Sequence, residues 1–126
     1  MRWGYLHQLL LVSAGIFLLY PACPTQAQGR AYRSSVDNRL NSDDLDALTA
    51  AARHLLDRPQ LAEGGLEAWS NPRSGASGTI VAGKPLSRSG VDCRVLNFFM
   101  HVPGPNADRN RVLTWCKTKD GWKIAG

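Results

Sequence analysis

Residues 91–118, VDCRVLNFFMHVPGPNADRNRVLTWCKT, decide the fold of this chain. Two runs rich in Val, Leu, Phe and Trp, at 91–102 and 111–118, predict β-strands. Between them lies Pro-Gly-Pro-Asn at 103–106, and each of these residue types favours a turn for its own conformational reason. The stretch therefore predicts an antiparallel hairpin centred on the peptide between Gly104 and Pro105.

Cys93 and Cys116 lie equally far from this turn centre, so the predicted register places them opposite each other. Opposed residues of a non-hydrogen-bonded antiparallel pair are about 4.5 Å apart at Cα, a separation that a disulfide spans. The same register sets Arg94 opposite Trp115, where a cation–π contact is expected. We therefore predict a cross-strand disulfide that contributes roughly 3 kcal/mol to stability. A metal site or a redox centre is the weaker alternative, because the chain has no CxxC spacing and no clustered histidines.

Turn signals on both sides extend the hairpin into a larger sheet. Upstream, signals at 71–72, 83–85 and 89–90 separate short strands predicted at 66–70 and 78–81. Downstream, Asp120-Gly121 predicts a two-residue turn of type I′ before a last strand at 122–125. The gaps leave no room for crossover helices, so we expect an antiparallel meander of about five strands within 66–125. Trp69, Trp115 and Trp122 are then predicted core residues, with an aromatic ligand platform as the alternative.

A helix is predicted at 42–57, ahead of the sheet. Asn41 can cap its N-terminus, and apolar residues such as Leu45, Leu48 and Leu55 recur at spacings of three and four. Pro59 follows its end. The expected fold class is α+β, with one N-terminal amphipathic helix packed on a small antiparallel meander that carries a cross-strand disulfide.

The N-terminal residues are typical of a secretory signal peptide. The run LLLVSAGIFLLY at 9–20 follows Arg2, has no charged side chain, and is shorter than the about 20 residues that span a membrane. A cut after Ala27 meets the requirement for small residues. We expect residues 1–27 to be removed, residues 28–40 to be a flexible polar segment, and residues 41–126 to form one domain. Lipidation of Cys23 is the alternative, although Tyr20 and Pro21 stand where lipoprotein signals favour Leu and a small residue.

The chain is basic, with a formal net charge of +5. Removal of the predicted leader takes away Arg2 alone among the charged residues, which leaves 14 basic and 10 acidic side chains, or +4. Residues 66–126 hold nine basic and four acidic side chains. This balance favours anionic envelope polymers as partners, and a solvated basic surface without a partner is the alternative. The candidate anion-binding residues are Arg94, Arg109, Arg111, Lys117, Lys119 and Lys123.

Catalytic motifs are not found in the sequence. It has no phosphate-binding Gly-rich loop, no GxSxG elbow and no HExxH. His54, on the predicted helix, and His101, at a strand end, are far apart in sequence, and nothing links either to a nucleophile. We therefore expect a protein that is not an enzyme and that has no cofactor and no metal.

Part of the chain also resembles a known family. WSNPRSGASG at 69–78, Cys-Arg at 93–94 and CKTKDGW at 116–122 form an ordered series that is similar to the C-terminal domain of the 17 kDa outer-membrane surface antigen family of proteobacteria. The match covers the chain from about residue 66 to the end. The resemblance implies a location and an architecture far more than a mechanism. The matching residues are Trp69, Asn71, Pro72, Gly75, Gly78, Arg94, Asp120, Gly121 and Trp122.

These observations predict a non-enzymatic exported protein of a bacterial envelope, in the periplasm, in the outer membrane or at the cell surface, with a structural or binding role. Its expected partners are anionic envelope polymers or an envelope protein, and not nucleic acid. Membrane association is expected only through a lipid on Cys23 or through a partner. The alternative is a secreted inhibitor or protein-binding module whose loop at 103–110 enters the cleft of a partner.

Overall fold

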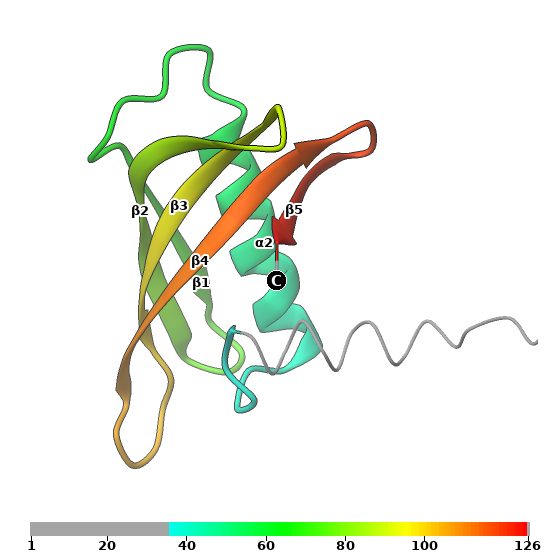
Figure 1. Cartoon of the computed structure of the whole chain (residues 1–126). Coiled ribbons are helices and arrows are strands. Elements are labelled where there is room, and N and C mark those ends of the chain that lie inside the picture. The colour runs from blue at the N-terminus through cyan, green and yellow to red at the C-terminus, as the bar shows by residue number, and fades with distance from the viewer. Residues whose placement is uncertain (1–35, 126) are drawn as a thin grey trace, which may run out of the picture.

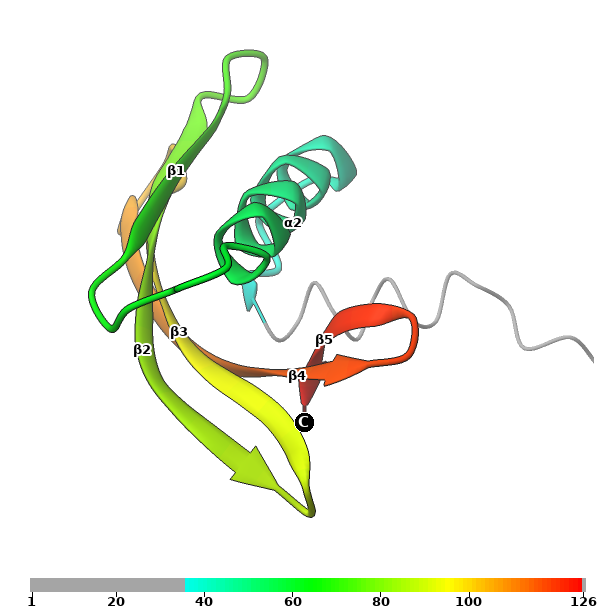
Figure 2. The same cartoon turned by 90° about the horizontal axis from the view of Figure 1, so that it is seen from above.

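The structure, a computed structural model, describes residues 36–125, in which helix α2 (Ser42–Leu56) precedes a five-stranded sheet. The sheet is antiparallel throughout, in the order β1-β2-β3-β4-β5, and it curls around α2 (Figures 1 and 2). The predicted α+β class is confirmed at this level. The predicted leader, Cys23 and residues 28–35 lie outside the described residues. The strands are β1 (Leu66–Asn71), β2 (Ala76–Arg88), β3 (Val91–His101), β4 (Asp108–Thr118) and β5 (Gly121–Ala125).

The register of the central hairpin is the predicted one. Cys93 pairs with Cys116 and Arg94 with Trp115. The two cysteines form a disulfide with their Cα atoms 4.0 Å apart, as expected for a non-hydrogen-bonded pair. The loop between β3 and β4 is closed by a hydrogen bond of 2.8 Å from the Val102 amide to the Ala107 carbonyl, so the predicted turn centre is confirmed.

Strand β2 is much longer than the predicted strand at 78–81. The sequence at 83–85 is not a turn, because the ladder to β3 continues through it with a register shift between Ala82 and Pro85. Two residues, Gly83 and Lys84, stand there opposite Val95, which is the pattern of a β-bulge. The pairing with β1 ends at Val81, so Pro85 lies on an edge where its missing N–H leaves no ladder bond unmade.

The turn between β4 and β5 differs from the prediction by one residue. Thr118 pairs with Gly121, so the loop residues are Lys119 and Asp120. Neither of these two has a positive φ, whereas Gly121, the residue that follows the loop, has a φ of 105°. A type I′ turn needs positive φ at both loop residues, so that prediction is wrong. The Thr118 hydroxyl stabilises the turn at Lys119-Asp120, because it accepts from the Asp120 amide and donates to the Gly121 carbonyl at 2.7 Å.

Helix α2 begins at a capping box. The Asn41 side chain accepts a hydrogen bond of 2.8 Å from the Asp44 amide, and the Asp44 carboxylate accepts one of 3.0 Å from the Asn41 amide. The helix ends at Leu56, one residue before the predicted end. Its buried face packs mainly against β1, and the residues of that face are Asp44, Leu45, Leu48, Ala51, Ala52, Leu55 and Leu56.

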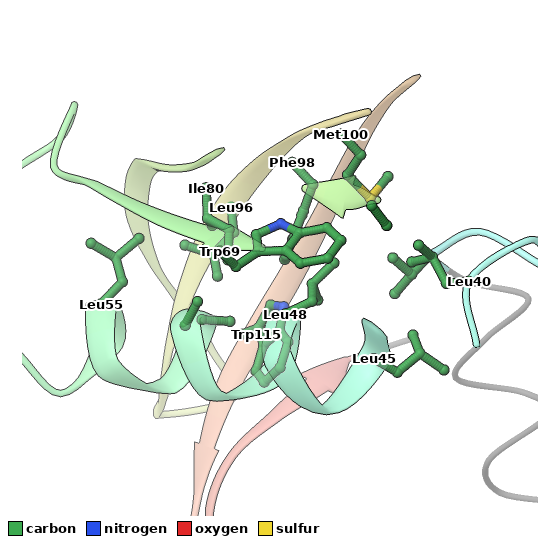
Figure 3. Packing of buried hydrophobic residues seen from close by; sticks show 14 of the residues in the cluster. Leu40, Leu45, Leu48, Leu55, Trp69, Ile80, Leu96, Phe98, Met100 and Trp115 are labelled. Carbon is green, nitrogen blue, oxygen red and sulfur yellow. The ribbon is translucent and has the colours of Figure 1, made fainter. Parts of the chain in front are cut away.

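The core lies between α2 and the inner, concave face of the sheet (Figure 3). Trp69 and Trp115 are buried there, as predicted, and Trp122 is partly buried and packs against the same cluster. Alternation along β3 assigns Leu96 and Phe98 to this inner face and leaves every second side chain on the outer one. No helix within residues 36–125 is long and apolar enough to cross a membrane.

Residues 36–40, expected to belong to a flexible segment, contribute to this core instead. Val36 and Leu40 are fully buried. The buried carboxylate of Asp37 forms ion pairs with Arg39 and, at 2.9 Å, with Arg109 on β4. This role could not be predicted from the sequence, because residues 36–40 stand among polar residues and their side chains meet their partners only in the folded chain.

Candidate anion-binding pocket

A cavity of about 500 Å³ is lined by residues at the ends of the β2–β3 and β4–β5 hairpins. Figure 1 shows these two hairpins at the same end of the molecule. The volume of the cavity is within the range of small-molecule sites. One wall is the chain that follows α2, from Leu56 to Leu61, and the other walls come from the ends of β2, β3, β4 and β5. The polar and aromatic side chains that line it are Arg58, Gln60, Ser87, Asp92, Arg94, Lys117 and Trp122.

The antiparallel register brings three of these side chains together. Arg94 pairs with Trp115 on β4, and Lys117 lies two residues further along the same strand. Trp122 pairs with Lys117 across β4 and β5. Because side chains alternate between the two faces of a strand, Arg94, Lys117 and Trp122 all lie on the inner face. The Lys117 ammonium and the Trp122 indole therefore lie side by side in the cavity, next to the Arg94 guanidinium.

Arg94 acts first as a structural clamp. Its guanidinium donates to the Leu61 carbonyl at 2.8 Å and to the Gly83 carbonyl at 3.1 Å. These bonds join the chain after α2 to the bulge of β2, so Arg94 fixes two walls of the pocket relative to each other. Its charge stays in the cavity, because neither acceptor is ionised.

Arg58 is neutralised by a neighbour. Its guanidinium pairs with the Glu67 carboxylate, which also lies 3.1 Å from Nδ1 of His54. The hydrogen bond to His54 first, and that to Arg58 next, hold the pKa of the Glu67 carboxyl below its ordinary value. Arg58 therefore adds little net charge to the pocket.

Lys117 differs from Arg58 because no described residue forms an ion pair or hydrogen bond with its ammonium group. It faces Trp122, whose indole is only half-buried. Asp92, an exposed acid, is the acidic side chain of the lining. The pocket thus combines the unpaired ammonium of Lys117 and the guanidinium of Arg94 with an aromatic face and one carboxylate.

The six candidate cations do not form one site. Arg94 and Lys117 line the pocket, whereas Lys119 lies in the β4–β5 turn and Lys123 follows Trp122 on the outer face of β5. Arg109 and Arg111 lie toward the opposite end of β4, where Arg109 is paired with Asp37. Four polar lining residues were missed, because no sequence pattern linked them to the cations: Arg58, Gln60, Ser87 and Asp92.

The WSNPRSG part of the motif at 69–78 holds the β1–β2 turn against α2. Asn71 donates from its side chain to Oδ1 of the buried Asp44 at 2.6 Å, and the Ser74 hydroxyl donates to the same oxygen. Asn71 also accepts from the Arg73 amide at 3.2 Å, and Gly75 has a φ of 78°. These motif residues therefore shape the fold rather than line the pocket.

Gly78 has a packing reason of its own. It pairs with Trp69 across β1 and β2. A Cβ at this position would lie 2.4 Å from the Phe99 carbonyl oxygen and 2.8 Å from Nε1 of Trp69. Only glycine lets the Trp69 indole lie over the sheet here.

The two histidines within residues 36–125 contact acids at different places. His54 contacts Glu67, as described, and Nδ1 of His101 lies 3.0 Å from Asp108 on the outer face. Both side chains of the second pair are exposed. Within residues 36–125, no three His, Cys, Asp or Glu side chains are grouped so that they could hold a metal ion.

Comparison with known proteins gives no match, neither with a protein-family model nor with a curated protein nor with a solved structure.

Proposed function

We propose that this chain is a non-enzymatic, exported binding protein of the bacterial envelope whose pocket takes an acidic group of an envelope polymer. The observation that carries the proposal is Lys117, a cation without a partner among the described residues, beside the half-buried indole of Trp122 in a cavity of about 500 Å³.

The disulfide supports export. Cys93 and Cys116 are joined across β3 and β4, and such bonds persist in oxidising compartments outside the cytoplasm. The signal-like sequence at 1–27 agrees with this, and the motif resemblance to the surface antigen family points to the same location. An envelope location would expose the pocket to acidic polymers.

The lining suits a ligand with a carboxylate or phosphate next to a ring. Lys117 and Arg94 attract the anion, and the indole of Trp122 offers an apolar face for the ring. Gln60 and Ser87 supply hydrogen bonds. Because the site is open to solvent, its electrostatic part should weaken as salt rises.

Binding to defined envelope fragments tests the proposal. Residues 28–126, with the disulfide formed, are titrated with acidic fragments of lipopolysaccharide and of peptidoglycan, and Trp fluorescence and calorimetry report binding. Lys117→Glu should lower the affinity about tenfold, whereas Lys119→Glu, an equal charge change outside the pocket, should leave it within about twofold. Binding that is absent, or that is insensitive to salt, contradicts the proposal.

A second candidate function is that of an inhibitor which presents the β3–β4 loop. One observation favours it: the guanidinium of Arg39 donates to the Pro105 carbonyl at 2.8 Å and to the Asn106 carbonyl at 3.1 Å. A loop held in place from outside loses less entropy when it binds. Capture of one stoichiometric partner from envelope extract, lost when residues 103–106 are replaced by Gly and Ser, would favour this function over the first.

A further inference from the structure

Half of β4 has an edge that no described residue pairs with. Strand β3 pairs with β4 from His101↔Asp108 to Cys93↔Cys116, but β5 pairs only with Thr114–Thr118 on the other side. Residues 108–113 therefore have a strand neighbour on one side alone within residues 36–125. Figure 1 shows β5 beside only the upper part of β4.

The register tells which backbone groups point out of this edge. The disulfide marks Cys93 and Cys116 as a non-hydrogen-bonded pair, with Cα atoms 4.0 Å apart. Such pairs recur at every second residue, and the Val102–Ala107 hydrogen bond agrees with this phase. The N–H and C=O groups of Asp108, Asn110 and Val112 therefore point away from β3. An incoming strand would find outward N–H donors at all three residues, and carbonyl acceptors without a described partner at Asp108 and Val112, because the Asn110 carbonyl already accepts from the Arg111 guanidinium.

The side chains along this edge alternate in kind. Val112 lies on the outer face and is 65% exposed. Arg111 belongs to the inner face, and its guanidinium donates to the Asn110 carbonyl at 2.8 Å, so its charge lies at the edge itself. Arg109 is already paired with Asp37. An added strand would thus meet an apolar side chain on one face and a cation on the other.

A second copy of the chain fits this edge poorly. Antiparallel pairing of two such edges centred on Arg111 would set two uncompensated guanidinium groups opposite each other, whereas pairing centred on Asn110 would set Arg111 opposite Arg109, whose charge Asp37 already compensates. Like charges directly opposite each other destabilise a sheet. The charge favours an acidic strand instead, in a protein whose net charge is +5.

We propose that the edge of β4 at residues 108–113 binds an extended acidic peptide segment, which extends the sheet by one strand. Its apolar residues lie beside Val112 on the outer face, and its Asp or Glu residues, at alternate positions, pair with Arg111 on the inner face. This site is separate from the pocket, which is lined by the other end of β4.

A designed peptide tests this proposal. Fluorescein-labelled GVEVEVG is titrated into residues 28–126 with anisotropy as the readout, and GVKVKVG is the matched control. The acidic peptide should bind at least about tenfold more tightly than the basic one, and Arg111→Glu should reverse that preference. Equal binding of both peptides, or no binding, overturns the proposal.

Amide hydrogen exchange locates the bound peptide. The amides of Asn110 and Val112 should exchange at least about tenfold more slowly in the complex, because the added strand accepts from them. Val112→Pro removes one of these outward donors without removing a β3–β4 ladder bond, so it should weaken binding while near-ultraviolet circular dichroism stays unchanged. Protection confined to β1 or to the pocket lining overturns the assignment.

Discussion

The two ends of the curled sheet differ in whether their charged side chains have partners. At the end where α2 begins, the buried carboxylates of Asp37 and Asp44 meet arginines, an amide side chain and a hydroxyl from other parts of the chain. At the end where α2 stops, Lys117 stays without a partner among the described residues, in a cavity. The first end uses its polar groups to fix the fold, whereas the second end leaves the Lys117 ammonium unpaired, and this is the group that we propose binds a ligand.

The largest expected effect concerns the disulfide near the pocket. The double variant Cys93→Ala with Cys116→Ala should lose about 3 kcal/mol of unfolding free energy, measured by urea denaturation, because the unfolded chain gains the freedom of an open loop. Wild-type protein treated with reductant should show the same loss. An unchanged midpoint for both would contradict a stabilising role of the bond.

The next largest expected effect concerns the end of the sheet where α2 begins. Asp44→Ala leaves the Asn71 amide and the Ser74 hydroxyl without their acceptor in a buried place, so it should cost about 2 to 3 kcal/mol by urea denaturation. Asp43→Ala, which removes an exposed acid from the same helix turn, is the matched control. Equal losses for the two variants would show that only the helix dipole is involved.

The smallest effect is a pH dependence at Glu67. Its folded pKa is lowered, so its carboxylate stabilises the protein above the ordinary pKa, and this contribution is lost as pH falls through the folded pKa. The stability difference between wild type and Glu67→Gln should therefore be present at about pH 6 and vanish toward about pH 3. In a His54→Ala background the difference should shrink, because the largest cause of the shift is gone. A difference that grows toward acid pH would contradict the sign.

The structure was predicted from the sequence most accurately where a turn signal and the positions of the two cysteines agreed. The turn at 103–106 and the positions of the two cysteines gave the β3–β4 register residue by residue. It failed at 83–85, because Gly and Pro favour an edge bulge as readily as a turn, and only the pairing with β3 distinguishes the two. At Gly121 the error came from the Thr118 hydroxyl, whose local bonds outweigh the Asp-Gly preference.

The candidate site was predicted only in part. Lys117 and Arg94 were identified as cations from composition, but the wall after α2 reaches them through tertiary packing that has no sequence signature. The same holds for Asp37 and Arg109, which are 72 positions apart in the chain and meet only in the fold. Their charge identified the candidate cations in the sequence, and only the structure distinguishes the cations without a partner from those that already have one.

Chemical-shift mapping with an acidic envelope fragment tests the contrast between the two ends most directly. Amide and indole resonances of the disulfide-bonded protein are followed during the titration. The largest shifts should fall on Lys117, Trp122 and Arg94, and those around Asp44 should stay unchanged. Shifts that cluster around Asp44, or that persist unaltered in Lys117→Glu, would contradict the assignment of the pocket as the binding end.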